Sequence, residues 1–256
     1  MPGFEEDREY FNGGAKAKKL EPVSKTNEGL VSFAKVFLYM FIYLVITGVV
    51  AFGVGYIIAS SYAKAVAEGG DGNAVLTTYL GVMIGAAIAM FIMVIIINFV
   101  VLRGKHSVLV PSIIYALLVG VLLSTFTIFV DWKLIGMAFG ITAGVFGVMA
   151  LIALISKGNM APLGMLGIGL LLGGGILALA NLFARSDAIG WAVSFIIFAA
   201  IMFITMFDVW NIKKICERGA MNSNISYYCA FIMYVDFINI FIRVLYYLII
   251  IFGNKK

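Results

Sequence analysis

The sequence predicts an all-α, polytopic membrane protein with seven transmembrane helices. The 256-residue chain is 63% hydrophobic and only 12% charged, and its mean hydropathy is +1.07. Soluble domains are nearer half apolar and a quarter charged, so a single soluble core could not hide this much apolar side chain. Seven separate apolar stretches follow one another, each about as long as the roughly 20 residues that cross a bilayer as a helix.

Short connections separate the seven predicted helices. Residues typical of turns occupy four of them, at 69–73, 103–105, 157–159 and 222–224. Short connections make consecutive helices neighbours in space. The expected helices cover residues of about 32–59, 77–102, 108–130, 133–156, 161–183, 189–210 and 225–252.

The first 29 residues differ from the rest because they are polar and mixed in charge. Their acidic residues come first and no cleavable apolar stretch follows, which is not the layout of a signal peptide. We expect residues 1–29 to form a mostly disordered tail and residues 30–256 to form one transmembrane domain.

Glycines recur four residues apart within three of the predicted helices. Such spacing lets the backbones of two helices approach closely in lipid, so plain helix packing is the expected role of these pairs. The pairs are Gly81 and Gly85, Gly136 and Gly140, and Gly169 and Gly173.

Lysine and arginine are concentrated in the tail and in the second, fourth and sixth connections. The positive-inside rule therefore places the N-terminus in the cytoplasm. The compact loops favour a bacterial plasma membrane over an organelle membrane. A last segment that crosses fully would put Lys255 and Lys256 outside, against the rule, so a re-entrant last segment stays open. The basic residues concerned are Arg8, Lys16, Lys18, Lys19, Lys25, Arg103, Lys105, Lys157, Lys213, Lys214 and Arg218.

Several classes of function find no support in the residues. Cys216 and Cys229 are the two cysteines, and isolated reduced thiols are expected. The single histidine, His106, sits in a basic loop without a zinc-binding pattern, where it is expected to be a cation near lipid head groups. The scattered positive charge indicates a membrane protein rather than a partner of nucleic acid, and no resident cofactor is expected.

Two aspartates, Asp208 and Asp236, lie inside the last two apolar stretches. An ionisable group inside a membrane is expensive and therefore marks a candidate functional site. Two carboxyl groups in one low-dielectric site cannot both ionise cheaply, so the pair is expected to share a proton at mildly acidic pH. The shared proton would hold two helices together, and its loss would add repulsion, which describes a pH-dependent latch. An anionic pocket rich in oxygen also suits transient binding of calcium.

A less specific interpretation is that each aspartate pairs privately, Asp208 with Lys213 or Asp236 with Arg243. Arg243 lies two helical turns beyond Asp236, too far for a relaxed direct bond. Asn239 lies three residues after Asp236 on the same helix face and is a candidate supporting residue.

Two short motifs around these aspartates resemble a known family. The segment FDVWNIK at 207–213 resembles the aromatic-Asp-x-x-Asn/Gln-Ile-Lys/Arg element of the Bax inhibitor (transmembrane Bax-inhibitor-motif) family, and YVDFINIF at 234–241 resembles that family's closing segment. The resemblance implies a seven-helix fold with the last helix central. It also implies a calcium (cation) leak channel governed by a pH-sensitive pair, here Asp208 and Asp236. Arg103 is the closest match to an arginine that interacts with the pair in bacterial members.

A channel is not an enzyme, so no enzymatic activity is expected on this interpretation. Two other classes of function remain open. The main alternative is a non-conducting membrane regulator or scaffold that binds partner helices through its small-residue faces. The lesser alternative is an intramembrane aspartyl protease, which also uses two carboxyl groups. The sequence lacks the glycine before Asp236 that would open the helix for a substrate. The lipid bilayer and calcium are the expected partners.

Overall fold

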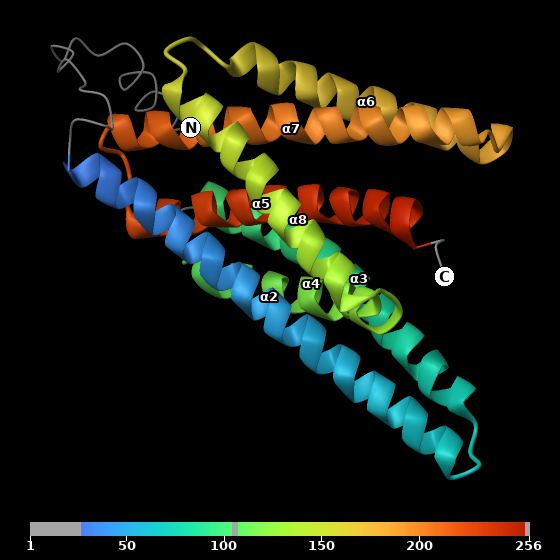
Figure 1. Cartoon of the computed structure of the whole chain (residues 1–256). Coiled ribbons are helices and arrows are strands. Elements are labelled where there is room, and N and C mark those ends of the chain that lie inside the picture. Colours follow the sequence, from blue (N-terminus) through green and yellow to red (C-terminus); the bar gives the residue numbers. More distant parts are fainter. Residues whose placement is uncertain (1–26, 104–106, 254–256) are drawn as a thin grey trace, which may run out of the picture.

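The computed structural model describes residues 27–103 and 107–253. Over these residues the chain forms seven α-helices, each long and apolar enough to cross a membrane. The predicted all-α, seven-helix fold is confirmed (Figure 1). The helices are α2 (Asn27–Ala67), α3 (Gly72–Arg103), α4 (Leu109–Phe129), α5 (Trp132–Ile155), α6 (Ala161–Ala184), α7 (Asp187–Glu217) and α8 (Ser223–Phe252).

Three helices are longer by more than a few residues than hydropathy predicted. α2 has 41 residues, α3 has 32 and α7 has 31. At a rise of about 1.5 Å per residue, α2 is roughly twice as long as a bilayer core of about 30 Å is thick. Its first turns include three residues assigned to the tail, and its last turns run through polar, helix-favouring sequence. The predicted disorder of the tail concerns residues 1–26, which lie outside the described residues.

Polar side chains cap the starts of two helices. The Asp131 carboxylate accepts a hydrogen bond from the backbone N–H of Lys133 at the start of α5. The Asn222 side chain accepts one from the N–H of Ile225 at the start of α8. Such N-caps satisfy backbone donors that a helix leaves free. Gly219 has a positive φ of 65° in the short turn before α8, a conformation that favours glycine.

α8 is the central helix of the bundle. It packs against α2, α4, α5 and α7, whereas α3 lies outside against α2 and α4, and α6 lies outside against α7 (Figure 1). The predicted central position of the last helix is therefore confirmed. α8 is one unbroken helix of 30 residues. A re-entrant segment would have to turn back within the membrane, so the re-entrant alternative is wrong.

A buried hydrogen bond ties the central helix to two neighbours. The Thr47 hydroxyl of α2 donates to the carbonyl oxygen of Ala116 of α4 at 3.0 Å. It also lies 2.6 Å from the hydroxyl of Tyr234 of α8. Because the one hydroxyl hydrogen of Thr47 is used on Ala116, the Tyr234 hydroxyl is the donor in the second bond. This contact joins α8 to α2 and α4 at one buried point.

The close helix contacts involve other glycines than the three predicted pairs. A Cβ at Gly164 of α6 would lie 2.6 Å from the ring of Phe207, and one at Gly167 would lie 2.9 Å from the carbonyl oxygen of Ala200. α6 and α7 can thus pack together only because these positions lack a side chain. The expected packing role is wrong for the predicted pairs, whose Cβ positions have no atom within 4 Å: Gly81, Gly85, Gly136, Gly140, Gly169 and Gly173.

Candidate functional site

The structure brings Asp208 of α7 and Asp236 of α8 together. Their carboxyl groups lie within hydrogen-bonding reach of each other. Asp236 is only 6% exposed and Asp208 is half-buried. An ionised carboxylate can only accept hydrogen bonds, so this contact requires a proton on one of the two groups. The geometry is therefore that of an acid pair holding one proton between two helices.

Few other donors reach the acid pair. Thr205 lies beside Asp236, one turn before Asp208 on α7, but its hydroxyl donates to the carbonyl oxygen of Ile201 at 2.9 Å. Among the described residues, no hydrogen bond reaches the buried Oδ2 of Asp236 from outside the pair. A buried acceptor without a donor is costly, which favours keeping a proton within the pair.

No basic residue neutralises the aspartates in the described part of the chain. Its two ion pairs are Lys64–Glu68 and Lys214–Glu217, both within single helices or their ends. The private pairing of Asp208 with Lys213, or of Asp236 with Arg243, is therefore not what the structure contains.

Lys213, a predicted supporting residue, points away from the pair. Its Nζ donates to the carbonyl oxygens of Leu154 at 2.6 Å and Ser156 at 2.9 Å. These are carbonyls that the C-terminal end of α5 leaves without a helical partner. Lys213 thus joins α7 to the end of α5.

Two further candidates have side chains outside the described part of the chain. Arg103 is the last residue of α3, and only its backbone is described. His106, expected to be a cation near lipid head groups, lies wholly outside the described residues.

Asn239 and Arg243 line a cavity that begins at Asp236. The cavity has a volume of about 670 Å³ and lies between α6, α7 and α8. Its polar lining comes from α8, and its other walls are aliphatic. The lining residues are Leu171, Ile197, Ile201, Ile204, Asp236, Asn239, Ile242, Arg243 and Tyr246.

A second cavity, of about 530 Å³, lies at the other end of the same side of α8. Tyr228 is its innermost residue on α8, and Asn222, Ser223 and Asn224 line it where α8 begins. Positions 228, 239 and 246 are separated by 11 and 7 residues, close to whole numbers of helical turns, so they share one face. The two cavities thus lie on one side of α8, with the acid pair between them.

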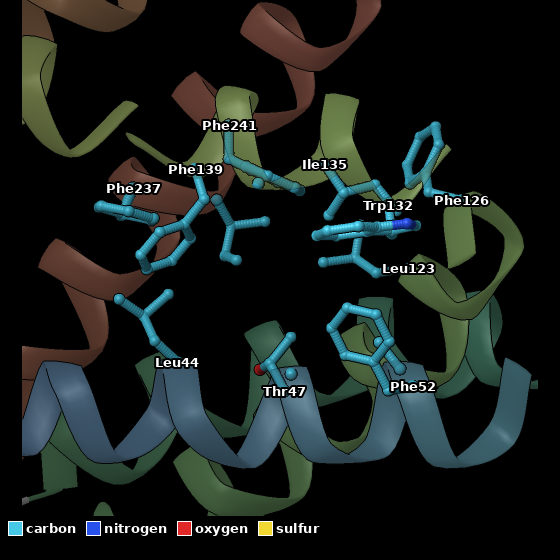
Figure 2. A pocket seen from close by; sticks show the side chains of 14 residues that line it. Leu44, Thr47, Phe52, Leu123, Phe126, Trp132, Ile135, Phe139, Phe237 and Phe241 are labelled. Atoms are coloured by element: carbon cyan, nitrogen blue, oxygen red, sulfur yellow. The ribbon is translucent and has the colours of Figure 1, made fainter. Parts of the chain in front are cut away.

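A third cavity, of about 410 Å³, lies on the opposite face of α8 and is apolar (Figure 2). Phe237 and Phe241 of α8 face Leu44 and Phe52 of α2 across it (Figure 2). Its one polar side chain, Thr47, is already hydrogen-bonded to Tyr234 and Ala116. This cavity therefore offers no oxygen ligands to a cation.

The acid pair is not a complete resident metal site. Among the described residues, no group of three or more His, Cys, Asp and Glu side chains could hold a metal ion. Calcium takes 6–8 oxygen ligands, and two carboxyl groups supply a minority of them. The pair fits a passing, partly hydrated ion better than a permanently bound one. Cys216 and Cys229 are both buried free thiols, as expected.

Seven spanning helices around a central helix that carries a buried acid define a multi-pass integral membrane protein. The family model described as "Inhibitor of apoptosis-promoting Bax1" matches residues 31–254. The chain therefore belongs to the Bax inhibitor family, and the resemblance of the two motifs is confirmed.

Bacterial relatives support the same membership. The protein named Inner membrane protein YbhL of Escherichia coli K12 is 29% identical over 180 residues, which cover 68% of this chain and 75% of that protein. The protein named Uncharacterized protein RP147 of Rickettsia prowazekii is 30% identical over 152 residues, which cover 56% of this chain and 60% of that protein.

Sequence reasoning missed the neutral residues around the pair. Thr205 precedes Asp208 by three residues, a spacing that places both on one helix face and that would have indicated it. Tyr228 was not singled out, because a tyrosine near a helix end is usually an interface anchor.

Proposed function

We propose that the protein is a pH-sensitive cation leak channel that passes calcium, with the Asp208–Asp236 pair as the closure of its route. The observation that carries the proposal is the position of the pair. It interrupts one side of α8 between two cavities that contain polar side chains, while the opposite cavity is apolar. Calcium is the transported substrate in this proposal, not a resident cofactor.

The protonation state of the pair decides whether α7 and α8 hold together. With one proton between them, the two carboxyl groups form a hydrogen bond that links the helices. Without that proton, two negative charges face each other. At about 4 Å and an effective dielectric constant of about 20, their repulsion is on the order of 4 kcal/mol. This exceeds a typical hydrogen bond of about 1 kcal/mol, so the closed contact depends on the proton.

The pair also offers a passing cation what it needs. Two carboxylates carry the charge that one divalent ion neutralises, and their oxygens replace some of its hydration shell. Because few other donors compete for these oxygens, an arriving calcium ion displaces mainly the shared proton. Proton and calcium are thus expected to compete for the same site.

The test is calcium flux into liposomes that contain the purified protein. We expect the wild-type flux to differ between pH 6 and pH 8, and the Asp208→Asn and Asp236→Asn variants to lose most of that difference. The matched control is Asp187→Asn, which removes an exposed carboxylate at the opposite end of α7 and is expected to behave as the wild type does.

Three results would contradict parts of the proposal. The wild-type pH response in both aspartate variants would assign pH sensing to another group. No flux from correctly folded protein would favour the non-conducting regulator that binds partner helices. Cleavage of a helical peptide substrate, lost in both variants, would favour the protease.

The proposal also specifies the membrane that holds the protein and the side of it that the N-terminus faces. The relative from Escherichia coli is named an inner membrane protein, and we place this chain in a bacterial plasma membrane. The N-terminus and residues 218–222 then face the cytoplasm, as the positive charges predict. Asp208 lies nine residues before the end of α7 at that side.

A further inference from the structure

Arg243 is a charged side chain in the last third of the central helix, nine residues before its end. It is half-buried, and among the described residues neither an ion pair nor a hydrogen bond reaches its guanidinium. An arginine at such a depth is costly in lipid and normally faces the bundle interior or a water-filled cavity. Arg243 lines the cavity of about 670 Å³ beyond Asp236, as expected for an arginine at this depth.

The polar residues of this cavity form one line along α8. Asp236, Asn239, Arg243 and Tyr246 follow each other at intervals of three, four and three residues, which keeps them on one helix face. At about 1.5 Å per residue, Arg243 lies roughly 10 Å from Asp236 along the axis. The line runs away from the 218–222 turn, toward the end of the bundle that the positive charges predict to face outward.

Among the described residues that line this cavity, Arg243 is the one basic side chain, and it lies on the far side from the acid pair. The facing walls from α6 and α7 are Leu171, Ile197, Ile201 and Ile204, which carry no charge. Low-dielectric walls concentrate the field of a single charge inside a cleft. A cation between the outer surface and the acid pair would therefore pass a fixed positive charge.

We infer that this cavity is the outer half of the cation route and that Arg243 restricts passage through it, divalent ions more than monovalent ones. The inference rests on the proposed leak function and adds a residue that determines throughput and valence selectivity. Coulomb energy is proportional to the charge of the ion, so Arg243 opposes a calcium ion twice as strongly as a potassium ion.

The charge effect makes a quantitative prediction about Arg243→Gln. Removing the charge should raise both fluxes, and the fold-increase for calcium should be about the square of the fold-increase for potassium, because the free-energy change doubles with ion charge. A twofold rise for potassium thus corresponds to about a fourfold rise for calcium. Both fluxes are measured in the same liposome preparation. Arg243→Lys keeps the charge and should stay near the wild type.

A charge removed elsewhere on the same side is the matched control. Lys133 is exposed near the start of α5, outside the cavity, and Lys133→Gln should leave the ratio of calcium to potassium flux unchanged. An equal ratio of calcium to potassium flux in wild-type protein and Arg243→Gln would overturn the inference.

Water access to the cavity can be measured without ion flux. In protein whose Cys216 and Cys229 are replaced by serine, Tyr246→Cys should react with a water-soluble, membrane-impermeant thiol reagent. Leu172→Cys, on α6 next to the cavity-lining Leu171, is 65% exposed on the outside of the bundle and should stay unmodified. Failure of Tyr246→Cys to react would contradict a hydrated cavity.

The two measurements separate failure of this inference from failure of the leak function. If the wild-type protein passes neither ion while Tyr246→Cys reacts, the proposed function fails and the hydrated cavity remains. If the wild-type protein conducts and the aspartate variants lose their pH response, but Arg243→Gln changes nothing, only the role of Arg243 fails.

Discussion

The hydroxyl of Thr47 connects three helices at one buried point. It donates to the Ala116 carbonyl of α4 and accepts from the Tyr234 hydroxyl of α8. Tyr234 lies two residues before Asp236, so this contact fixes the part of α8 that carries the acid. The position of Asp236 thus depends on the hydrogen bond between Thr47 and Tyr234, on the far side of α8.

The two ends of this bond should differ in their effect on stability. Tyr234→Phe removes one donor but leaves Thr47 bonded to Ala116, so we expect a loss of about 1 kcal/mol or less. Thr47→Val leaves the Tyr234 hydroxyl without a partner in a buried site and should cost more, about 1–3 kcal/mol. Thermal unfolding in detergent measures both, and a larger loss for Tyr234→Phe would show that another donor or acceptor shares the network.

At the residue scale, the charged residues of the site could be predicted from the sequence. Asp208 and Asp236 stood out because an acid in an apolar helix is costly, and their proximity agrees with the expectation of a joint site. The partner of Lys213 could not be predicted, because it consists of backbone carbonyls that leave no mark in the sequence. Arg243 was assigned near the pair, but its position on a cavity wall depends on where α6 and α7 pack.

Glycines of α6 permit a close approach between α6 and α7. Gly164, Gly167 and Gly174 of α6 all face α7, and a Cβ at Gly167 would meet the backbone of Ala200. A backbone atom cannot move aside as the end of a long side chain can. α6 is therefore a closely packed neighbour of α7, the helix that carries Asp208.

A pair of alanine substitutions on α6 should show this difference in packing. Gly167→Ala places a methyl group 2.8 Å from Ile204 and 2.9 Å from the Ala200 carbonyl oxygen, and overpacking of this kind costs about 1–3 kcal/mol. Gly169→Ala adds the same group where no atom lies within 4 Å, so unfolding should change little. Equal melting temperatures for the two variants would contradict the close approach of α6 to α7.

Helix number and order were predictable because about 20 apolar residues in a row have few alternatives to a spanning helix. Helix ends were less predictable, since the last turns of α2 and α7 are polar and rest on helix propensity rather than hydropathy. Glycine spacing identified helix faces with small residues, yet it could not say which face meets a neighbour. In a chain with 28 glycines, that choice depends on the whole bundle.

At the scale of the whole molecule, seven crossings place the start of α2 and the end of α8 on opposite sides of the membrane. α8 begins beside the 218–222 turn and runs unbroken to Phe252. The polar cavity next to Tyr228 and the cavity that holds Arg243 therefore open toward opposite ends of the bundle. The acid pair between them is closer to the end where α8 begins, and the orientation decides which compartment that is.

Cysteine labelling in intact cells tests the orientation. In protein whose native cysteines are replaced by serine, Ala220→Cys should resist an impermeant thiol reagent added outside, and Glu68→Cys should react. Both positions are exposed in turns at opposite ends of the bundle, so burial does not explain a difference between them. Labelling of Ala220→Cys after the cells are opened confirms that the thiol is intact. The reverse pattern would place the start of α8 outside, and the acid pair would then respond to the external proton concentration rather than to that of the cytoplasm.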